Sequence, residues 1–340
     1  MKIKQFLSLT LAAVLSAVMM ASCGGSTAAP SAPSASSNLA DVKAVVNIAM
    51  LTGPSGIGAA KLLDNAYNGN ALNDYKYTVA TSIDEITPKL LNDTFDIAAV
   101  PSNVAAMLYN NSGGKVKMIA INTLGGLYVL EKGNTVTDFA SLKGKTVYIS
   151  GEGTTTEYAV RALLTDNNID PDRDVKLKFV DGHAKLAEIA ASGEVDFCVL
   201  PEPYVTDVLL KNTDMRLALD VNALWRSAYG DDAALPMGCV VARTGFIEKN
   251  PDAVEMFLTE YKQSVEFVNG NVDAAAELCA KYGLLDSAAV GKAAIARCSA
   301  VFISGNGMQS TAEPYFSILN KYSAKSIGGR LPDEAFYYYN

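Results

Sequence analysis

The chain has almost no histidine and few cysteines, and these absences exclude several classes of function. His183 is its only histidine in 340 residues, which excludes a zinc enzyme that uses several histidine ligands. The five cysteines include no CxxC pair and are too few for a disulfide scaffold. No dense basic stretch is present, and the net charge of −8 disfavours binding to nucleic acid, whose affinity comes largely from phosphate neutralisation. The side-chain clusters that a metal ion needs are also missing, so we expect neither a metal nor a cofactor.

Apolar residues, by contrast, are plentiful. They make up 49% of the chain, against 19% charged residues. This is the composition of a globular protein with a sizeable core, and it excludes a disordered chain or a coiled coil. The length allows one large domain or two lobes of roughly 150 residues each.

The first residues form a targeting signal. Lys2 and Lys4 precede an uncharged, mostly apolar stretch over 6–22. This order predicts a secretory signal peptide over 1–22, because the stretch is too short and too rich in Ser and Thr for a membrane span of about 20 apolar residues. The segment that ends at Cys23 resembles a bacterial lipobox, with Met20 where Leu is usual. The resemblance implies that Cys23 becomes the lipid-linked first residue, whereas the alternative is an ordinary signal peptide with a chance cysteine. Residues 23–41 then form a flexible Gly/Ser/Ala/Pro tether.

The body of the chain alternates strands and helices. Short runs rich in Val and Ile predict strands at 45–50, 75–80, 95–100, 116–121, 145–149, 175–180, 195–200 and 215–221. Helical patterns lie between most of them, which favours βαβ units with parallel strands. A shift of one hundred positions places FDIAAVP at 95–101 on VDFCVLP at 195–201, and the strand at 45–49 on that at 145–149. Residues 45–108 and 145–208 are therefore predicted to be two copies of one architectural unit.

After residue 235 the pattern changes. One more strand is predicted at 235–244, followed by helices at 251–268, 272–282, 287–298 and 308–322. A helical tail cannot form a separate sheet, so we expect it to pack back on the first lobe. This gives a first lobe of 42–124 plus 236–340 and a second lobe of 125–235. The two crossings, at 123–128 and 232–238, would form a two-strand hinge.

Four segments carry a resemblance to a known family: DIAAVPSNVAAMLYN (96–110), LKGKTVYISGEGTTTEYAVRALL (142–164), GEVDFCVLPEPYVTDVLL (193–210) and NPDAVEMFLTEYKQSVEFVN (250–269). Together with the lipobox and the repeated units, they resemble a solute-binding protein of an ABC importer. The nearer resemblance is to the nitrate/sulfonate/taurine and thiamine-pyrimidine-precursor group. It implies an α/β, two-lobed type II periplasmic-binding-protein fold, with a mostly parallel sheet flanked by helices in each lobe.

The same resemblance implies a function. A small organic solute would be captured between the lobes and delivered to an ABC permease driven by its ATPase. The protein would be a non-catalytic monomer, held by its lipid on the outer face of the cytoplasmic membrane. None of the four segments identifies the solute, although a ring or an acid group suits the residues described next.

Ligands of open α/β sheets bind beyond the carboxyl ends of the strands, so the turns after the strands are the candidate site. The predicted ligand-binding residues are Pro54, Ser55, Gly56, Ser102, Asn103, Gly153, Thr154, Thr155, Thr156, His183, Glu202 and Tyr204. The turn at 151–156 is the most informative, because glycines allow close approach and a helix N-terminus offers free N–H groups to an oxyanion.

Each candidate also has a structural explanation. The threonines and the pair Ser102–Asn103 are suited to capping the helices that follow them. Glu202 could accept hydrogen bonds from an amine or a ring N–H, or stabilise its own helix N-terminus. A lone histidine such as His183 is more often a structural hydrogen-bonder, although in a cleft it could make binding pH-sensitive. Tyr204 could stack on a ring of the solute or belong to the core.

Two other functions compete with the transport receptor. Related two-lobed folds host biosynthetic enzymes, but export, a single histidine and the lack of an evident nucleophile–base pair count against an exported enzyme. A sensor would need a signalling domain, which we do not see. Trp225, near the second crossing, is predicted to pack rather than to bind. The sequence leaves open whether Cys279 and Cys298 form a disulfide.

Overall fold

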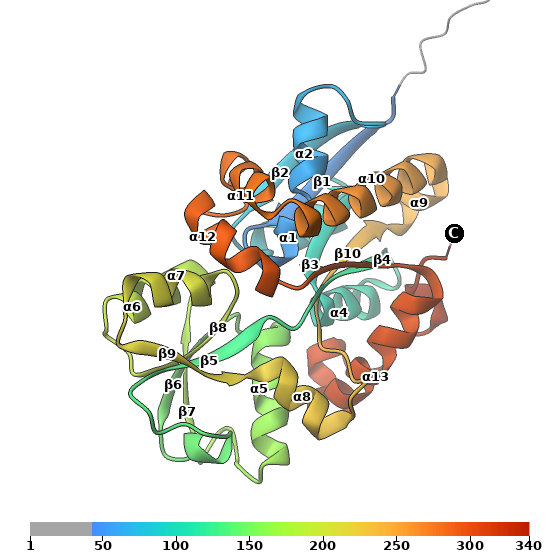
Figure 1. The fold of residues 1–340 in the computed structure, drawn as a ribbon. Coiled ribbons are helices and arrows are strands. Elements are labelled where there is room, and N and C mark those ends of the chain that lie inside the picture. Colours follow the sequence, from blue (N-terminus) through green and yellow to red (C-terminus); the bar gives the residue numbers. More distant parts are fainter. Residues whose placement is uncertain (1–42, 340) are drawn as a thin grey trace, which may run out of the picture. The chain divides into compact units, whose positions relative to one another are not determined.

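The computed structural model describes residues 43–339. The predicted signal peptide, Cys23 and the tether lie outside the described residues. Within 43–339, no helix is both long and apolar enough to cross a membrane. Figure 1 shows two sheets, each flanked by helices, joined by two extended connections.

The first sheet has six strands in the order β11-β4-β10-β3-β1-β2. These are β1 (Val45–Leu51), β2 (Asp74–Ala80), β3 (Ile97–Pro101), β4 (Val116–Leu124), β10 (Pro236–Arg243) and β11 (Ala300–Ile303). β1 is parallel to β2 and β3, whereas β10 is antiparallel to β3 and β4. Strands such as β3 are buried on both faces, which explains their continuous apolar sequence. We call the part built on this sheet the first lobe.

The second sheet has five strands in the order β7-β6-β8-β5-β9. These are β5 (Leu127–Lys132), β6 (Thr146–Ser150), β7 (Lys176–Val180), β8 (Phe197–Pro201) and β9 (Met215–Asp220). β6 is parallel to β7 and β8, and β5 is antiparallel to β8 and β9. We call the part built on this sheet the second lobe.

The helices cover both faces of each sheet. The α-helices are α1 (Pro54–Ile57), α2 (Ala60–Tyr67), α3 (Thr87–Leu91), α4 (Ser102–Ser112), α5 (Thr155–Asp166), α6 (His183–Ala191), α7 (Tyr204–Lys211), α8 (Val221–Tyr229), α9 (Thr244–Lys249), α10 (Pro251–Gly270), α11 (Val272–Lys281), α12 (Ala288–Ala294) and α13 (Gly305–Ser323). Short 3-10 helices are η1 (Ile83–Glu85), η2 (Ala140–Leu142), η3 (Ile295–Arg297), η4 (Ala324–Ile327) and η5 (Glu334–Phe336).

The alternation of side chains along each strand sorts the core into layers. In β8, Cys198 and Leu200 pack with residues of α6 and α7, whereas Val199 belongs to the core that contains α5. That second core also includes residues of α4, α8 and α13, so it runs from one sheet to the other. Trp225 lies inside it, fully buried against the rings of Tyr229 and Tyr315, which confirms the prediction that it packs.

The predicted repeat is confirmed by the sheet order. β1 lies between β2 and β3, and β6 lies between β7 and β8, with parallel pairing in all four cases. Three expectations need correction. The sheets are mixed rather than mostly parallel, because β5, β10 and β11 run antiparallel to their neighbours. The tail after residue 250 is not wholly helical, since it contains β11. The strand β5 was not predicted at all.

The cysteines of the described region are all reduced. Cys198, Cys239, Cys279 and Cys298 are free and buried. Cys279 and Cys298 therefore form no disulfide in this structure, which answers the question that the sequence left open.

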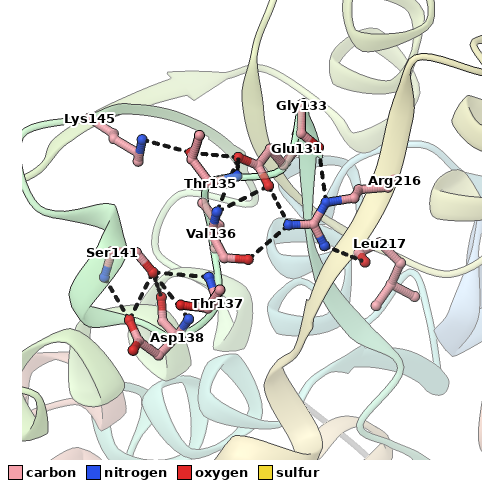
Figure 2. Close-up of polar contacts among 10 residues, drawn as sticks. All are labelled: Glu131, Gly133, Thr135, Val136, Thr137, Asp138, Ser141, Lys145, Arg216 and Leu217. Atoms are coloured by element: carbon pink, nitrogen blue, oxygen red, sulfur yellow. Dashed lines mark hydrogen bonds and ion pairs between the residues drawn. The ribbon is translucent and has the colours of Figure 1, made fainter.

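A buried carboxylate fixes the long connection between β5 and β6. Figure 2 shows Glu131, whose side chain is fully buried, accepting hydrogen bonds from Thr135 N and Oγ1, both at 2.6 Å, and from Val136 N. Arg216 of β9 completes the cluster, with one guanidinium nitrogen 2.5 Å from Glu131 Oε2 and Nε donating to Gly133 O at 2.9 Å. The connection is thus tied to the edge strand of the second sheet.

Candidate solute-binding site

The turns that follow the strands of the two sheets meet at the seam between the lobes. Asn103, at the start of α4, is fully buried and reaches across the seam. Its Nδ2 donates to Gly153 O at 2.9 Å and to Ser326 O at 3.2 Å, and its Oδ1 accepts from Thr155 Oγ1 at 3.2 Å. Tyr315 OH donates to the same threonine oxygen at 3.0 Å. The structure therefore brings together three of the predicted residues, from both lobes.

A second contact across the seam involves Tyr204. Gly53 has a φ of +83°, in the left-handed region that favours glycine, and a Cβ there would lie 3.0 Å from Tyr204 Cε2. The tyrosine ring of the second lobe thus lies directly against the backbone of the first lobe, next to Pro54. On its other side, the ring centroid is 5.5 Å from that of His183.

These contacts continue around the seam. A Cβ atom at Gly151, in the turn before α5, would lie 3.4 Å from the Cε1 atom of His183, so the imidazole lies against this turn. In the first lobe, Ser55 Oγ lies against Gly238 of β10, which pairs with Pro101, the residue before Ser102. The turns after β1, β3, β6, β7 and β8 therefore surround one region, as the position of the strand ends predicts.

The N-terminus of α5 offers free donors to this region. Thr154 is the N-cap, and its Oγ1 donates to Gly151 O at 2.6 Å. Glu157 accepts from Gly153 N at 2.7 Å. The N–H groups of Thr155 and Thr156 come at the start of the helix, where no intrahelical acceptor exists, and no described residue accepts from them. The aligned peptide dipoles of this 12-residue helix favour an anion at that end.

His183 is held in one orientation by Ser150. The distance from Ser150 Oγ to His183 Nδ1 is 2.6 Å. His183 is half-buried as a residue, and its imidazole ring is surrounded by protein. This burial disfavours the charged form and lowers the pKa of His183 from 6.5 to about 4. The ring is therefore neutral at physiological pH. A pH-sensitive contact through His183, which the sequence suggested, is not expected above about pH 5.

Glu202 is already satisfied by protein groups. Its carboxylate is fully buried and accepts from Thr206 N and Thr206 Oγ1, both at 3.0 Å, and from Arg297 Nε at 2.7 Å. Of its two predicted roles, the contacts fit stabilisation of its own helix, α7. Arg297 lies in η3, on the first lobe, so the ion pair is a second polar link across the seam, besides the hydrogen bonds of Asn103. Sequence reasoning missed it because nothing in the local pattern connects residues 95 positions apart.

A groove is lined in part by Gly153, whose carbonyl oxygen accepts from Asn103. Its volume is about 750 Å³, within the usual range for small-molecule sites. Its walls are formed by Ile83, Asp84, Thr87, Val104, Met107, Asn111, Glu152, Gly153, Thr154, Glu157, Tyr158, Lys325, Gly328 and Gly329. A smaller cavity of about 20 Å³, beside Thr52 and Tyr204, has room for one water molecule.

The fold and this seam define a class of protein: two α/β lobes whose strand ends face each other. Comparisons with known proteins narrow the class. A family model described as "ABC transporter, phosphonate, periplasmic substrate-binding protein" matches residues 73–284. The chain belongs to this family.

Solved structures share the fold at low sequence identity. An ABC transporter structure from Parabacteroides distasonis is 24% identical, with a TM-score of 0.72, and the match covers 87% of this chain and 99% of that one. The alkanesulfonate-binding protein SsuA from Xanthomonas axonopodis pv. citri, bound to MOPS, is 13% identical, with a TM-score of 0.65 and coverage of 85% and 95%. The periplasmic nitrate-binding protein NrtA from Synechocystis is 14% identical, with a TM-score of 0.61 and coverage of 86% and 83%. A comparison with curated sequences found no significant match.

These findings confirm the type II periplasmic-binding-protein fold and the predicted role. The protein is an ABC-type periplasmic solute-binding protein for import. Members of its family are substrate-binding proteins rather than enzymes.

Proposed function

We propose that this protein captures a small organic solute with a phosphonate- or sulfonate-like head group at the seam between its lobes, and delivers it to an ABC permease and its ATPase. The observation that carries the proposal is a set of donors at the N-terminus of α5, the N–H groups of Thr155 and Thr156, from which no described residue accepts and which begin the helix at the seam. Such a helix end suits the oxygens of an anion without a basic side chain.

The donors around the head group would come from both lobes. Ser55 and Thr156 are nearly buried, and neither hydroxyl forms a hydrogen bond with a described residue. Neither is among the fully enclosed hydroxyls of the described residues, so a solute can reach them. The Ser102 hydroxyl is fully buried and lies against the thiol of Cys239, so it is not counted as a donor to the solute. An oxyanion in the site would accept from Ser55 and Thr156.

The other candidate residues have supporting roles in this proposal. Asn103 joins the lobes over the solute, and Glu202 and Arg297 hold α7 in place. Tyr204 and the neutral His183 form one wall. Pro54, Gly56, Gly153 and Thr154 shape the turns, and the rest of the solute extends into the groove beside Val104 and Met107.

The finer features of the molecule belong to the same proposal. Cys23 would carry the lipid that holds the protein on the outer face of the cytoplasmic membrane, after removal of residues 1–22, with residues 23–41 as the tether. The lobes would comprise 42–124 plus 236–340 and 125–235. The protein would act as a monomer, so that both lobes remain free to contact the permease.

No catalysis is proposed. Ser150 and His183 do form a serine–histidine pair, which the sequence did not reveal. However, the serine is fully buried, and a histidine with a pKa near 4 is a poor general base at neutral pH. A bound solute should therefore be recovered unchanged, and a product detected by mass spectrometry would contradict the proposal.

A thermal-shift screen of the soluble chain from residue 40 tests the proposed ligand class. The panel contains alkylphosphonates, alkanesulfonates, taurine, nitrate, amino acids, and thiamine with its pyrimidine precursor. A solute that binds only the native state raises the melting temperature by mass action, and we expect the strongest shift from a phosphonate or sulfonate. A strongest shift from a cationic solute, or a flat screen of protein that mass spectrometry shows to be free of bound compounds, would refute the ligand class.

Two threonines of α5 provide a matched pair of variants. Thr156→Val removes a hydroxyl at the seam, whereas Thr165→Val removes an exposed hydroxyl at the other end of the helix, where it donates only to Arg161 O. Thr156→Val should weaken binding of the best ligand by about tenfold, and Thr165→Val should leave it unchanged. Equal affinities for both variants would remove Thr156 from the site.

A further inference from the structure

The turn that contains Ser55 is fixed by hydrogen bonds from a buried side-chain amide of β4. Asn122 of β4 is almost fully buried, and its Nδ2 donates to Ser55 O at 2.9 Å and to Tyr261 OH at 3.2 Å. The neighbouring Thr123 Oγ1 donates to Pro54 O at 3.3 Å. The backbone of residues 54 and 55 is therefore fixed to the central part of the first sheet, rather than being a free loop.

The side chain of Ser55 occupies space that is left by the absence of a side chain at Gly238. A Cβ atom at Gly238 would lie 2.6 Å from Ser55 Oγ and 2.7 Å from Asn122 Oδ1. Carbon atoms do not approach oxygen this closely without displacing it. Gly238 also lies inside the sheet, paired with Pro101 of β3 and Thr123 of β4, so its own backbone has little freedom to move. Only glycine at this position leaves room for the serine hydroxyl where it stands.

We infer that Gly238 and Asn122 are positioning residues for solute binding: they place the Ser55 hydroxyl at the first lobe's side of the seam. The inference rests on the proposed function, because it requires Ser55 to contact the solute. Packing alone does not explain the arrangement. Asn122 holds the Ser55 backbone and Gly238 leaves space for the nearly buried hydroxyl, yet that hydroxyl forms no hydrogen bond with a described residue. A group held in this way is prepared for a partner that arrives from outside.

The test compares two glycine substitutions. Gly238→Ala places a methyl group against Ser55 Oγ, whereas Gly245→Ala in α9 places one where no atom lies within 4 Å. Affinity for the strongest ligand of the screen is measured by titration calorimetry on the soluble chain from residue 40, and circular dichroism checks folding. We expect Gly238→Ala to weaken binding by about tenfold, the usual loss for one hydrogen bond to a charged group, and Gly245→Ala to leave it unchanged.

A double-mutant cycle separates positioning from general packing. Ser55→Ala alone should also weaken binding by about tenfold. In the Ser55→Ala background, Gly238→Ala should cost less than about twofold, because the hydroxyl that it displaces has already been removed. If Gly238→Ala does not fold, Asn122→Ala replaces it in the same cycle, since it removes the hydrogen bond that holds the serine backbone.

The outcomes distinguish this inference from the proposed function. A folded Gly238→Ala variant that binds with wild-type affinity would overturn the inference alone. An equal loss in both backgrounds would show that Gly238 serves packing and not Ser55, and would also overturn it. If the wild-type chain binds none of the ligands, the proposed function fails and the inference fails with it.

Discussion

Replacement of Arg216 by methionine should destabilise the second lobe by leaving a buried charge without its cation. The guanidinium contacts Glu131 Oε2 at 2.5 Å and also donates to the carbonyl oxygens of Gly133 and Val136, at 2.9 and 2.8 Å. Figure 2 shows that the cluster draws together the start and the middle of the β5–β6 connection. Methionine keeps much of the length and the apolar stem of the side chain but none of these contacts.

The size of the expected loss in unfolding free energy follows from the environment of Glu131. Removing one partner of a buried ion pair costs about 3–5 kcal/mol of unfolding free energy. Here the carboxylate is fully buried, but it keeps its donors from Thr135 and Val136, and the Arg216 side chain is 34% exposed. Water can partly replace an exposed cation, so we expect the lower end of that range, about 3 kcal/mol at pH 7.

The stability difference between wild type and Arg216→Met should depend on pH in one direction. Burial tends to raise the pKa of Glu131, but hydrogen bonds from Thr135, Val136 and Arg216 outweigh it and hold the pKa below 4.5. A carboxyl whose pKa is lowered by folding stabilises the protein above its unfolded pKa, and this contribution is lost as the pH falls through the folded pKa. Without Arg216, the folded pKa rises and the carboxylate can be protonated. The difference between wild type and variant should therefore shrink as the pH falls from 7 towards 4.

Urea unfolding of the soluble chain, followed by circular dichroism and by the fluorescence of Trp225, measures both effects. The matched control is Arg173→Met, because Arg173 is 86% exposed and its contact with Asp170 is a surface pair at 3.6 Å, worth less than about 0.5 kcal/mol. A loss below about 1 kcal/mol for Arg216→Met, or a difference that grows in acid, would refute the reasoning.

Three further predictions concern the seam and the buried cysteines. Asn103→Ala removes the hydrogen bonds to Gly153 and Thr155, which should weaken solute binding by about tenfold in calorimetry; wild-type affinity would contradict a role in closure. Because the pKa of His183 is about 4, affinity for an alkanesulfonate, whose charge does not change in this range, should be constant between pH 5.5 and 8. A step near pH 6.5 would show that the imidazole is not enclosed. Cys279 and Cys298 should react with a thiol reagent only after unfolding; failure to react even then would indicate a disulfide.

Much of the fold could be predicted because it depends on local pattern. The strands β1, β3, β6 and β8 are short apolar runs bounded by turns, and their pattern is visible in the sequence. β5 and β11 were missed for a physical reason. Both are short apolar runs, LYVLEK and AVFI, but such a run does not by itself distinguish a strand from a crossing segment or the end of a helix. Pairing with neighbours far away in the chain decides it, β5 with β8 and β9, and β11 with β4.

Some residues of the candidate site could also be predicted from local pattern, and others could not. The turns at 54–56, 102–103 and 151–156 were predicted because they follow strand ends, a position that the order of elements already determines. Asn122, Gly238 and Arg297 were not predicted. They lie within a strand or a 3-10 helix rather than in a turn, and no local signal marks them. Their importance comes from contacts with Ser55 and Glu202, which pairing and packing bring close.

The sequence by itself determined the repeated unit and the turns at the strand ends, because these follow from hydrophobic periodicity and the order of elements. The class of protein was indicated by the resemblance of four segments to a known family. Only the tertiary structure decided how the candidate residues are used. It engages Asn103 and Glu202 in links between the lobes, and no residue within 43–339 accepts from the N–H groups of Thr155 and Thr156. A hydrogen bond depends on distance and direction in space, and residues 95 positions apart acquire these only when the chain folds.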